Sequence, residues 1–302
     1  MCVSREQSII GSQATGLAIG SGGNHWLYGG LLNGYLARLA GKDPSRIPPL
    51  VDFDLHNLHP IETDAGIGTI EQYFATEIPQ SEKHSRSNYI DRYIAATVAF
   101  GHACLLPNDL EWGVASTIKS YFLMQELQKH YLRVPVATIE YNHNGQLLNT
   151  NDALLSGAYT HGQIKITYQN ALEIHVNLGW ETSWEVVKDE TTYTLPPGSF
   201  CAWNDKGLLV YSADTGIGRI DYAACEEYLF VDTRGHKLQF GPVTLDGAAV
   251  FKERKWEIDV VPFSCESGIE VNVGQYWPDR KLPRLRLLAF KGDTDEPEVF
   301  RA

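Results

Sequence analysis

The sequence of 302 residues contains few cysteines, no long apolar run and no excess of basic residues. Its five cysteines stand at wide spacings without a CxxC pair, which is typical neither of a disulfide framework nor of a zinc cluster. No apolar run approaches the roughly 20 residues of a membrane-spanning helix. The first residues also lack a basic segment followed by a continuous apolar one. We therefore expect no membrane span, no metal site and no signal peptide in this chain, and the sequence leaves its cellular location open.

Acidic residues outnumber basic ones by 37 to 25, so the formal net charge is -12. Such an excess repels phosphate backbones and anionic lipid headgroups, which argues against nucleic acid and membrane surfaces as partners. The glycine-rich stretch that begins at Gly20 also departs from a dinucleotide-binding motif, because His25 stands where the third glycine belongs. The lysine of a phosphate-binding P-loop is missing too, and we expect no cofactor.

The two halves of the chain differ in their hydrophobic period. Up to about residue 155, apolar strand-like runs alternate with amphipathic helical ones. This pattern predicts strands at 14–23, 50–60 and 103–107, and helices at 26–41, 89–103 and 111–132. After residue 156, short β-branched or aromatic-rich segments are separated by Gly, Asn, Asp or Pro, which is typical of antiparallel strands. We predict two domains, an α/β domain over 1–155 and an all-β sandwich over 156–302.

Strands separated by helices imply parallel pairing, as in a (β/α) barrel or an open doubly wound layer. A complete eight-unit barrel needs about 250 residues, so the first domain has room for about three to four βα units. The predicted fold class is therefore α/β plus all-β, with an incomplete (β/α) barrel before the sandwich. An incomplete barrel exposes apolar edges that another chain normally covers, and we expect a homo-oligomer.

The predicted strand over 50–60, with the sequence LVDFDLHNLHP, carries polar residues on one face. By the period-two rule Asp52, Asp54 and His56 point the same way, opposite the apolar residues. In a barrel this polar face would rise toward the rim where active sites lie. Two carboxylates and an imidazole are costly to bury without a partner or a role. We expect Asp54 to be the first catalytic carboxylate and Asp52 the second, with His56 orienting them or sharing their protons.

The same polar face has a purely structural alternative, an internal ion-pair network with Arg92 or Lys119. Further carboxylates follow the predicted strands: Glu62 after the second, and Asp109 and Glu111 after the third. Glu62 and Glu111 are candidate partners for Asp54 in catalysis. The position of Asp109 favours a helix cap, since an acidic residue in the first turn is stabilised by the helix dipole.

Aromatic residues are abundant, with 15 Tyr, 11 Phe and 7 Trp. One group follows the first predicted strand in IGSGGNHWLYGG, at residues 19–30. Here Asn24 and His25 offer hydrogen bonds beside the flat rings of Trp26 and Tyr28, a combination that suits a sugar-binding site. The alternative is a turn whose two aromatic rings belong to the core.

Several segments together resemble the C-terminal half of large bacterial glycoside hydrolases. The resemblance rests on SGGNHWLYGGLLNGYLARL, PLVDFDLHNLHP, YIDRYIAATVAFGHACLLP, LEIHVNLGWETSWEV and YTLPPGSFCAWN. These hydrolases are (β/α)8-barrel enzymes, relatives of endo-α-N-acetylgalactosaminidases and α-galactosidases, whose barrel is followed by β-sandwich domains. The resemblance implies a carbohydrate substrate and a pair of Asp/Glu residues at strand ends, acting as acid and as nucleophile or base.

One residue departs from the family pattern. Gly22 stands where the resemblance leads us to expect an acid, as Ser-Glu-Gly rather than Ser-Gly-Gly. Our leading hypothesis is a glycoside hydrolase-like protein that acts on oligo- or polysaccharide through strand-end carboxylates. The alternative is a catalytically silent carbohydrate-binding or scaffold protein derived from such an enzyme. Gly22 favours the alternative, whereas the polar strand face with Asp52 and Asp54 favours the enzyme.

Overall fold

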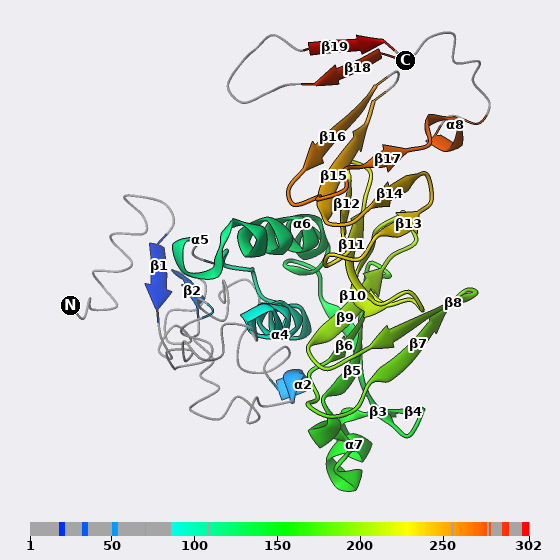
Figure 1. Ribbon diagram of the computed structural model, residues 1–302. Coiled ribbons are helices and arrows are strands. Elements are labelled where there is room, and N and C mark those ends of the chain that lie inside the picture. The colour runs from blue at the N-terminus through cyan, green and yellow to red at the C-terminus, as the bar shows by residue number, and fades with distance from the viewer. Residues whose placement is uncertain are drawn as a thin grey trace.

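The computed structural model describes residues 18–21, 32–35, 50–53, 70, 86–107, 109–254, 257–276, 278, 286–289 and 298–301. These residues form mostly antiparallel β-structure, built around one 12-stranded sheet (Figure 1). Two longer helices lie against this sheet. Among the described helices, none combines the length and the apolar character that crossing a membrane requires.

The large sheet is a meander in which neighbours along the chain are mostly neighbours in space. Its main path runs β16-β15-β12-β11-β10-β9-β6-β5-β3-β4, and a hairpin of β7 and β8 branches from β10. The strands are β3 (Val136–His143), β4 (Gln146–Asn149), β5 (Gln163–Tyr168), β6 (Glu173–Asn177), β7 (Trp184–Lys188), β8 (Thr191–Leu195), β9 (Ser199–Trp203), β10 (Leu209–Asp214), β11 (Arg219–Ala224), β12 (Leu229–Asp232), β15 (Ala248–Glu253) and β16 (Ile258–Pro262).

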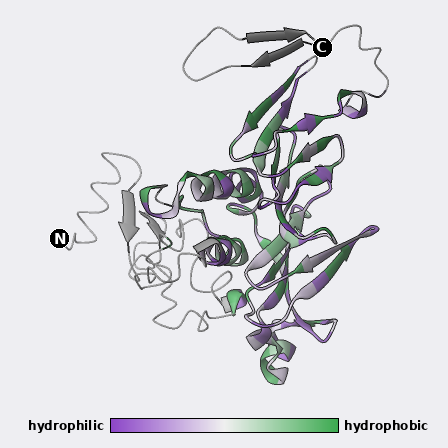
Figure 2. Cartoon of the chain, viewed as in Figure 1, coloured by the Kyte–Doolittle hydropathy of each residue, from purple (hydrophilic) through white to green (hydrophobic). Residues whose placement is uncertain are grey.

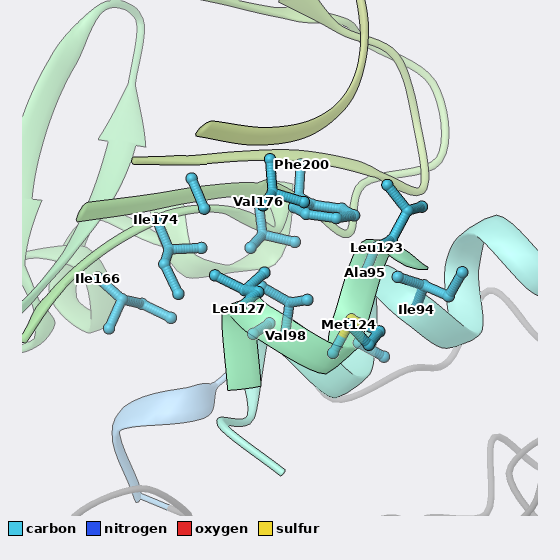
Figure 3. Close-up of a cluster of buried hydrophobic side chains, with 14 of the residues drawn as sticks. Ile94, Ala95, Val98, Leu123, Met124, Leu127, Ile166, Ile174, Val176 and Phe200 are labelled. Atoms are coloured by element: carbon cyan, nitrogen blue, oxygen red, sulfur yellow. The ribbon is translucent and has the colours of Figure 1, made fainter. Parts of the chain in front are cut away.

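One face of the large sheet, here called the inner face, is covered by α4 (Arg86–Ala99) and α6 (Val114–Tyr131). The main core lies between these helices and the sheet (Figure 3). Its fully buried side chains include Ile94, Val98, Leu123, Leu127, Ile166, Ile174, Val176 and Phe200. Burying each large side chain of this kind contributes about 1.5–3 kcal/mol, so this layer provides much of the driving force for folding.

The opposite, outer face is partly covered by two smaller units. The β7–β8 hairpin packs onto β9 and β10, and a three-stranded sheet packs onto β12 and β15. The small sheet consists of β13 (Leu238–Phe240), β14 (Val243–Leu245) and β17 (Glu270–Val271). Figure 2 shows hydrophobic and hydrophilic residues alternating along strands of the large sheet. This alternation places different residues on the two faces, as the period-two rule requires.

Shorter elements complete the described chain. They are β1 (Ala18–Ser21), β2 (Leu32–Tyr35), α2 (Val51–Phe53), α5 (Asp109–Trp112), α7 (Thr150–Ser156), the 3-10 helix η5 (Ala158–His161), α8 (Val273–Tyr276), β18 (Arg286–Ala289) and β19 (Glu298–Arg301). β1 and β2 pair in parallel, and β18 and β19 pair antiparallel.

The predicted fold class, an incomplete (β/α) barrel followed by a sandwich, is wrong. The segment expected to be the second strand contains the short helix α2, and Val51 is buried in the main core. Residues 103–107 form no strand, and the helix expected over 26–41 contains the strand β2. A few alternating residues fit a strand and a helical turn equally well, so the local pattern could not separate them. The interpretation as a TIM barrel is wrong because, among the described residues, these strands and this helix are absent from the expected places. The homo-oligomer stays a prediction.

Other parts of the pattern were interpreted correctly. The helices expected over 89–103 and 111–132 are found as α4 and α6, and most short segments after residue 156 are strands. The antiparallel sheet begins earlier than expected, at Val136, because β3 and β4 form a hairpin through Asn144 and Gly145. Both turn residues have positive φ angles, 53° and 87°, which Asn-Gly pairs adopt readily in tight hairpins. The division of the chain near residue 155 stays a prediction.

Candidate functional site

Most residues of the predicted site lie outside the described part of the chain. This group comprises Gly22, Asn24, His25, Trp26, Tyr28, Asp54, His56 and Glu62. Two predicted catalytic residues are described: Asp52 is partly buried in α2, and Glu111 is exposed in α5. The grouping of these carboxylates around Asp54 therefore stays a prediction.

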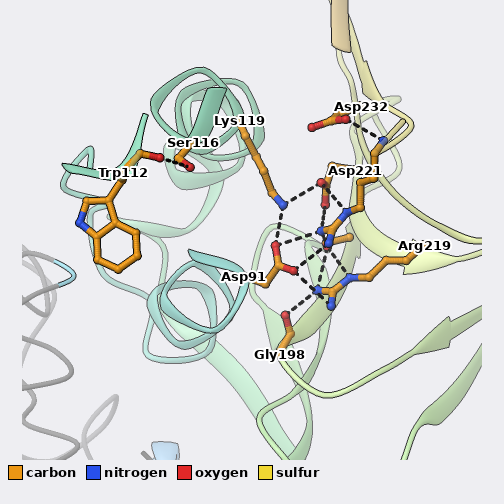
Figure 4. Close-up of polar contacts among 10 residues, drawn as sticks. Asp91, Trp112, Ser116, Lys119, Gly198, Arg219, Asp221 and Asp232 are labelled. Carbon is orange, nitrogen blue, oxygen red and sulfur yellow. Dashed lines mark hydrogen bonds and ion pairs between the residues drawn. The ribbon is translucent and has the colours of Figure 1, made fainter. Parts of the chain in front are cut away.

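The structure contains a buried ion cluster between the helices and the inner face of the sheet (Figure 4). Lys119 on α6 places its Nζ 2.5 Å from Asp91 Oδ1 and 2.8 Å from Asp221 Oδ2. Arg234, which follows β12, bridges the same two carboxylates at 2.9 Å and 2.8 Å. Arg219 on β11 adds a contact of 3.3 Å between its Nη1 and Asp91. Lys119 thus pairs with Asp91 and Asp221, two acids that the expected network did not include, and the network of Asp52 and Asp54 with Arg92 or Lys119 stays a prediction.

The two carboxylates of this ion cluster are held ionised. Burial alone would raise the pKa of Asp221, but Arg234 and Lys119 outweigh it and hold that pKa well below its usual range. The pKa of Asp91 is also lowered, because Lys119, Arg219 and Arg234 outweigh the effect of burial. A carboxyl group with a lowered pKa is a poor proton donor at neutral pH.

The guanidinium groups of Arg219 and Arg234 donate their hydrogen bonds to other groups of the protein. Arg234 donates from Nε, Nη1 and Nη2 to Asp91 and Asp221. Arg219 donates from Nε to the hydroxyl of Ser212 and from Nη2 to the carbonyl oxygen of Gly198. We therefore interpret the ion cluster as a clamp that joins both helices to the sheet.

A continuous row of aromatic rings crosses the outer face of the sheet. We call it the aromatic row; it comprises Trp184, Tyr193, Trp203, Tyr211, Tyr222 and Phe240. Centroids of neighbouring rings lie 6.2 Å apart for Tyr193 and Trp203, and 5.1 Å apart for Tyr193 and Tyr211. Tyr211 and Tyr222 are stacked at 4.9 Å with 14° between their planes, and Phe240 follows at 6.4 Å from Tyr222.

The strand register brings these rings together. Tyr211 is paired with Cys201 on one side and with Tyr222 on the other, so all three side chains share the outer face. Trp203 follows two residues after Cys201 on the same face. Tyr193 and Trp184 come from the β7–β8 hairpin that folds onto these strands.

The aromatic row is only partly covered. Tyr193 and Tyr211 are buried, whereas Trp203, Tyr222 and Phe240 keep part of their surface exposed. Charged groups lie at the Trp203 end: Lys188 Nζ is 5.9 Å from the centroid of the Trp203 ring, and Glu173 is the cross-strand partner of Trp203. The row thus combines flat apolar rings with an ammonium group and a carboxylate.

Comparison with family models, with curated proteins and with solved structures found no match. The resemblance to glycoside hydrolases therefore stays a hypothesis. The site must be judged on its own chemistry. The abundance of aromatic residues is evident in the sequence, but the row was not predicted from it. The available signal was an aromatic residue at an outward position in each of several successive strands.

His175 lies between the rings of Trp184 and Trp203, with centroid distances of 5.2 Å and 5.1 Å. Its side chain is buried, and neither ring nitrogen makes a hydrogen bond of good geometry with the described residues. Glu173 Oε1 stands 3.2 Å from Nε2, and Lys165 pairs with the same carboxylate at 3.0 Å. Burial, followed by the positive charge of Lys165, lowers the pKa of His175 to about 3, so the imidazole is neutral at pH 7.

The described part of the chain contains no candidate metal site. Its His, Cys, Asp and Glu side chains include no group of three or more that could hold a metal ion. The described residues thus offer stacking surfaces and fixed charges, which are the means of binding a ligand.

Proposed function

We propose that the protein binds carbohydrate and that the aromatic row is the binding surface. The observation that carries the proposal is the unbroken chain of ring contacts from Tyr193 to Phe240, with Trp203 and Tyr222 partly exposed. The C–H bonds on one face of a pyranose ring carry a slight positive charge, which the electron-rich face of an aromatic ring attracts.

Polar groups beside the aromatic row support the same ligand class. The carboxylate of Glu173 and the ammonium group of Lys188 lie at the Trp203 end, where they can bind sugar hydroxyl groups. A net charge of -12 argues against nucleic acid, the other common ligand that stacks on aromatic side chains. The alternative from the sequence, carbohydrate binding without turnover, therefore becomes the leading hypothesis.

Substituting Trp203 or Tyr222 by alanine is expected to weaken carbohydrate binding about tenfold or more, because buried aromatic contacts dominate binding energy. The test is a panel of soluble polysaccharides in affinity electrophoresis, followed by calorimetry with the best binder. Tyr121→Ala is the matched control, since Tyr121 is an aromatic residue of α6 that is 44% exposed. Binding that is equal in all variants would contradict the assignment to the aromatic row, provided that their thermal unfolding is unchanged.

Hydrolysis has a separate test. If the predicted carboxylates act as acid and as nucleophile or base, Asp54→Asn is expected to abolish turnover of aryl-glycosides, and Asp52→Asn to reduce it strongly. Release of the aryl group is the measurement, with Asp152→Asn as a control on the exposed surface of α7. Turnover that survives both substitutions would contradict the catalytic assignment, and sugar binding without turnover in the wild type would favour a silent binding protein.

A further inference from the structure

Trp180 presents a second aromatic surface beside the end of strand β6 of the large sheet. It stands in the loop between β6 and β7 and is 37% exposed. The guanidinium carbon of Arg92 on α4 lies 3.2 Å from the centroid of the indole ring. Because Arg92 occupies one face of the ring, a ligand could stack only on the opposite face.

The loop that carries Trp180 is held rigidly. Asn177, which is fully buried, donates from Nδ2 to the carbonyl oxygens of Thr182 and Leu195, both at 2.8 Å. Its Oδ1 accepts a hydrogen bond from the amide of Gly179 at 3.0 Å. A Cβ atom added to Gly179 would lie 2.6 Å from the carbonyl oxygen of His161, so the loop packs closely against the neighbouring backbone. The fold thus fixes the backbone on both sides of the indole.

Arg92 fixes the ring itself. Its guanidinium is buried and donates to the carbonyl oxygen of Gly179 at 3.0 Å, in the same loop. The positive guanidinium is attracted to the electron-rich face of the indole ring. The exposed indole is therefore held in one orientation before any ligand arrives, which lowers the entropic cost of binding.

Polar residues follow Trp180 in the same loop. Glu181, Thr182 and Ser183 follow Trp180 directly and are all exposed. The hydroxyl of Thr182 accepts a hydrogen bond from Gln163 at 3.3 Å, which orients it. One aromatic face beside a carboxylate and hydroxyl groups suits a single pyranose ring, stacked on the indole with its hydroxyl groups at the rim.

We infer that Trp180 forms a second carbohydrate-binding site, separate from the aromatic row, which stacks one sugar ring on a preorganised indole. The inference rests on the proposed function, because it takes carbohydrate as the ligand. Two sites on one chain let a long polysaccharide engage both, and the second contact then forms at high effective concentration. Short oligosaccharides occupy the two sites independently.

The experiment is calorimetric titration of the full chain with hexasaccharides of glucose, mannose and galactose, and with the corresponding polysaccharides. We expect two hexasaccharides bound by the wild type and one by Trp180→Ala, with at least tenfold weaker binding of the polysaccharide. Trp180→Phe keeps a flat ring and is expected to retain both sites. Tyr121→Ala again serves as the control for loss of an exposed aromatic residue.

The outcomes separate this inference from the proposed function. An unchanged number of bound hexasaccharides in Trp180→Ala, together with loss of binding in Trp203→Ala, would overturn the second site and leave the aromatic row. Loss of a site in Trp180→Ala with full binding in Trp203→Ala and Tyr222→Ala would support Trp180 and overturn the row. A wild type that binds none of the sugars would overturn both.

Discussion

Arg234→Met is expected to lower the free energy of unfolding by about 3–5 kcal/mol, because it removes one of the cations that neutralise two buried carboxylates. The guanidinium of Arg234 donates two hydrogen bonds to Asp91 and two to Asp221. Both carboxylate side chains are at most 1% exposed, so water cannot replace the lost contacts. Methionine keeps most of the volume of the arginine stem, so the loss in the free energy of unfolding reflects the removed charge rather than lost packing.

An exposed ion pair provides the matched control. Arg254 Nη2 lies 2.8 Å from Asp259 Oδ2, but the two side chains are 66% and 40% exposed. Arg254→Met is expected to cost less than about 1 kcal/mol, since solvent screens an exposed pair. Equilibrium unfolding in urea measures both variants. Equal losses in the two variants would show that the ion cluster does not clamp the helices to the sheet.

The wild type is expected to lose about 2 kcal/mol of stability through His175 alone when the pH falls from 7 to 5. The pKa of His175 is lowered from 6.5 to about 3 in the folded protein, with burial as the main cause. Below pH 6.5 the imidazole of His175 is therefore protonated in the unfolded chain but not in the folded protein. The contribution of His175 to stability is fully present above pH 6.5. It is lost at about 1.4 kcal/mol per pH unit as the pH falls toward the folded pKa.

The variant His175→Phe isolates this effect, because phenylalanine keeps a ring between Trp184 and Trp203 but cannot be protonated. Unfolding in urea at several pH values between 7 and 4.5 is the measurement, and the variant is expected to show a flatter profile than the wild type. This window lies above the pH range in which the contribution of Asp91 and Asp221 to stability changes, because carboxylates with lowered pKa values contribute fully above their unfolded pKa of about 4 and lose that contribution as the pH falls below it. Parallel profiles would mean that the imidazole is not buried in neutral form.

The helical patterns over 89–103 and 111–132 and most short strand patterns after residue 156 were interpreted correctly, whereas the helix expected over 26–41 and the strands expected over 50–60 and 103–107 were not. The helical period of α6 extends over 18 residues, enough to exclude a strand. By contrast, the alternation around Val51 covers few residues and predicted a barrel strand. The structure has the short helix α2 there. The strand expected over 103–107 is also absent: Leu105 and Leu106 are apolar but 38% and 47% exposed, and none of the described strands pairs with them.

The candidate site could be predicted only in part. The period-two rule indicates which side chains of one strand share a face, as those of Cys201 and Trp203 do. Their neighbours on other strands could not be predicted, because a shift of one residue in register moves every side chain to the opposite face. The predicted site around Asp54 lies outside the described residues, so its chemistry stays a prediction.

By itself, the sequence determined the local features: the two long helices, the short antiparallel strands and the tight turn at Asn144 and Gly145. Only the tertiary structure decided that Asp91, Lys119 and Asp221 meet in one ion cluster, and that rings from the hairpin and the sheets form one row. The physical reason is that propensity and periodicity act over a few residues. Contacts between distant segments depend on strand register and helix docking, which the packing of the whole core selects.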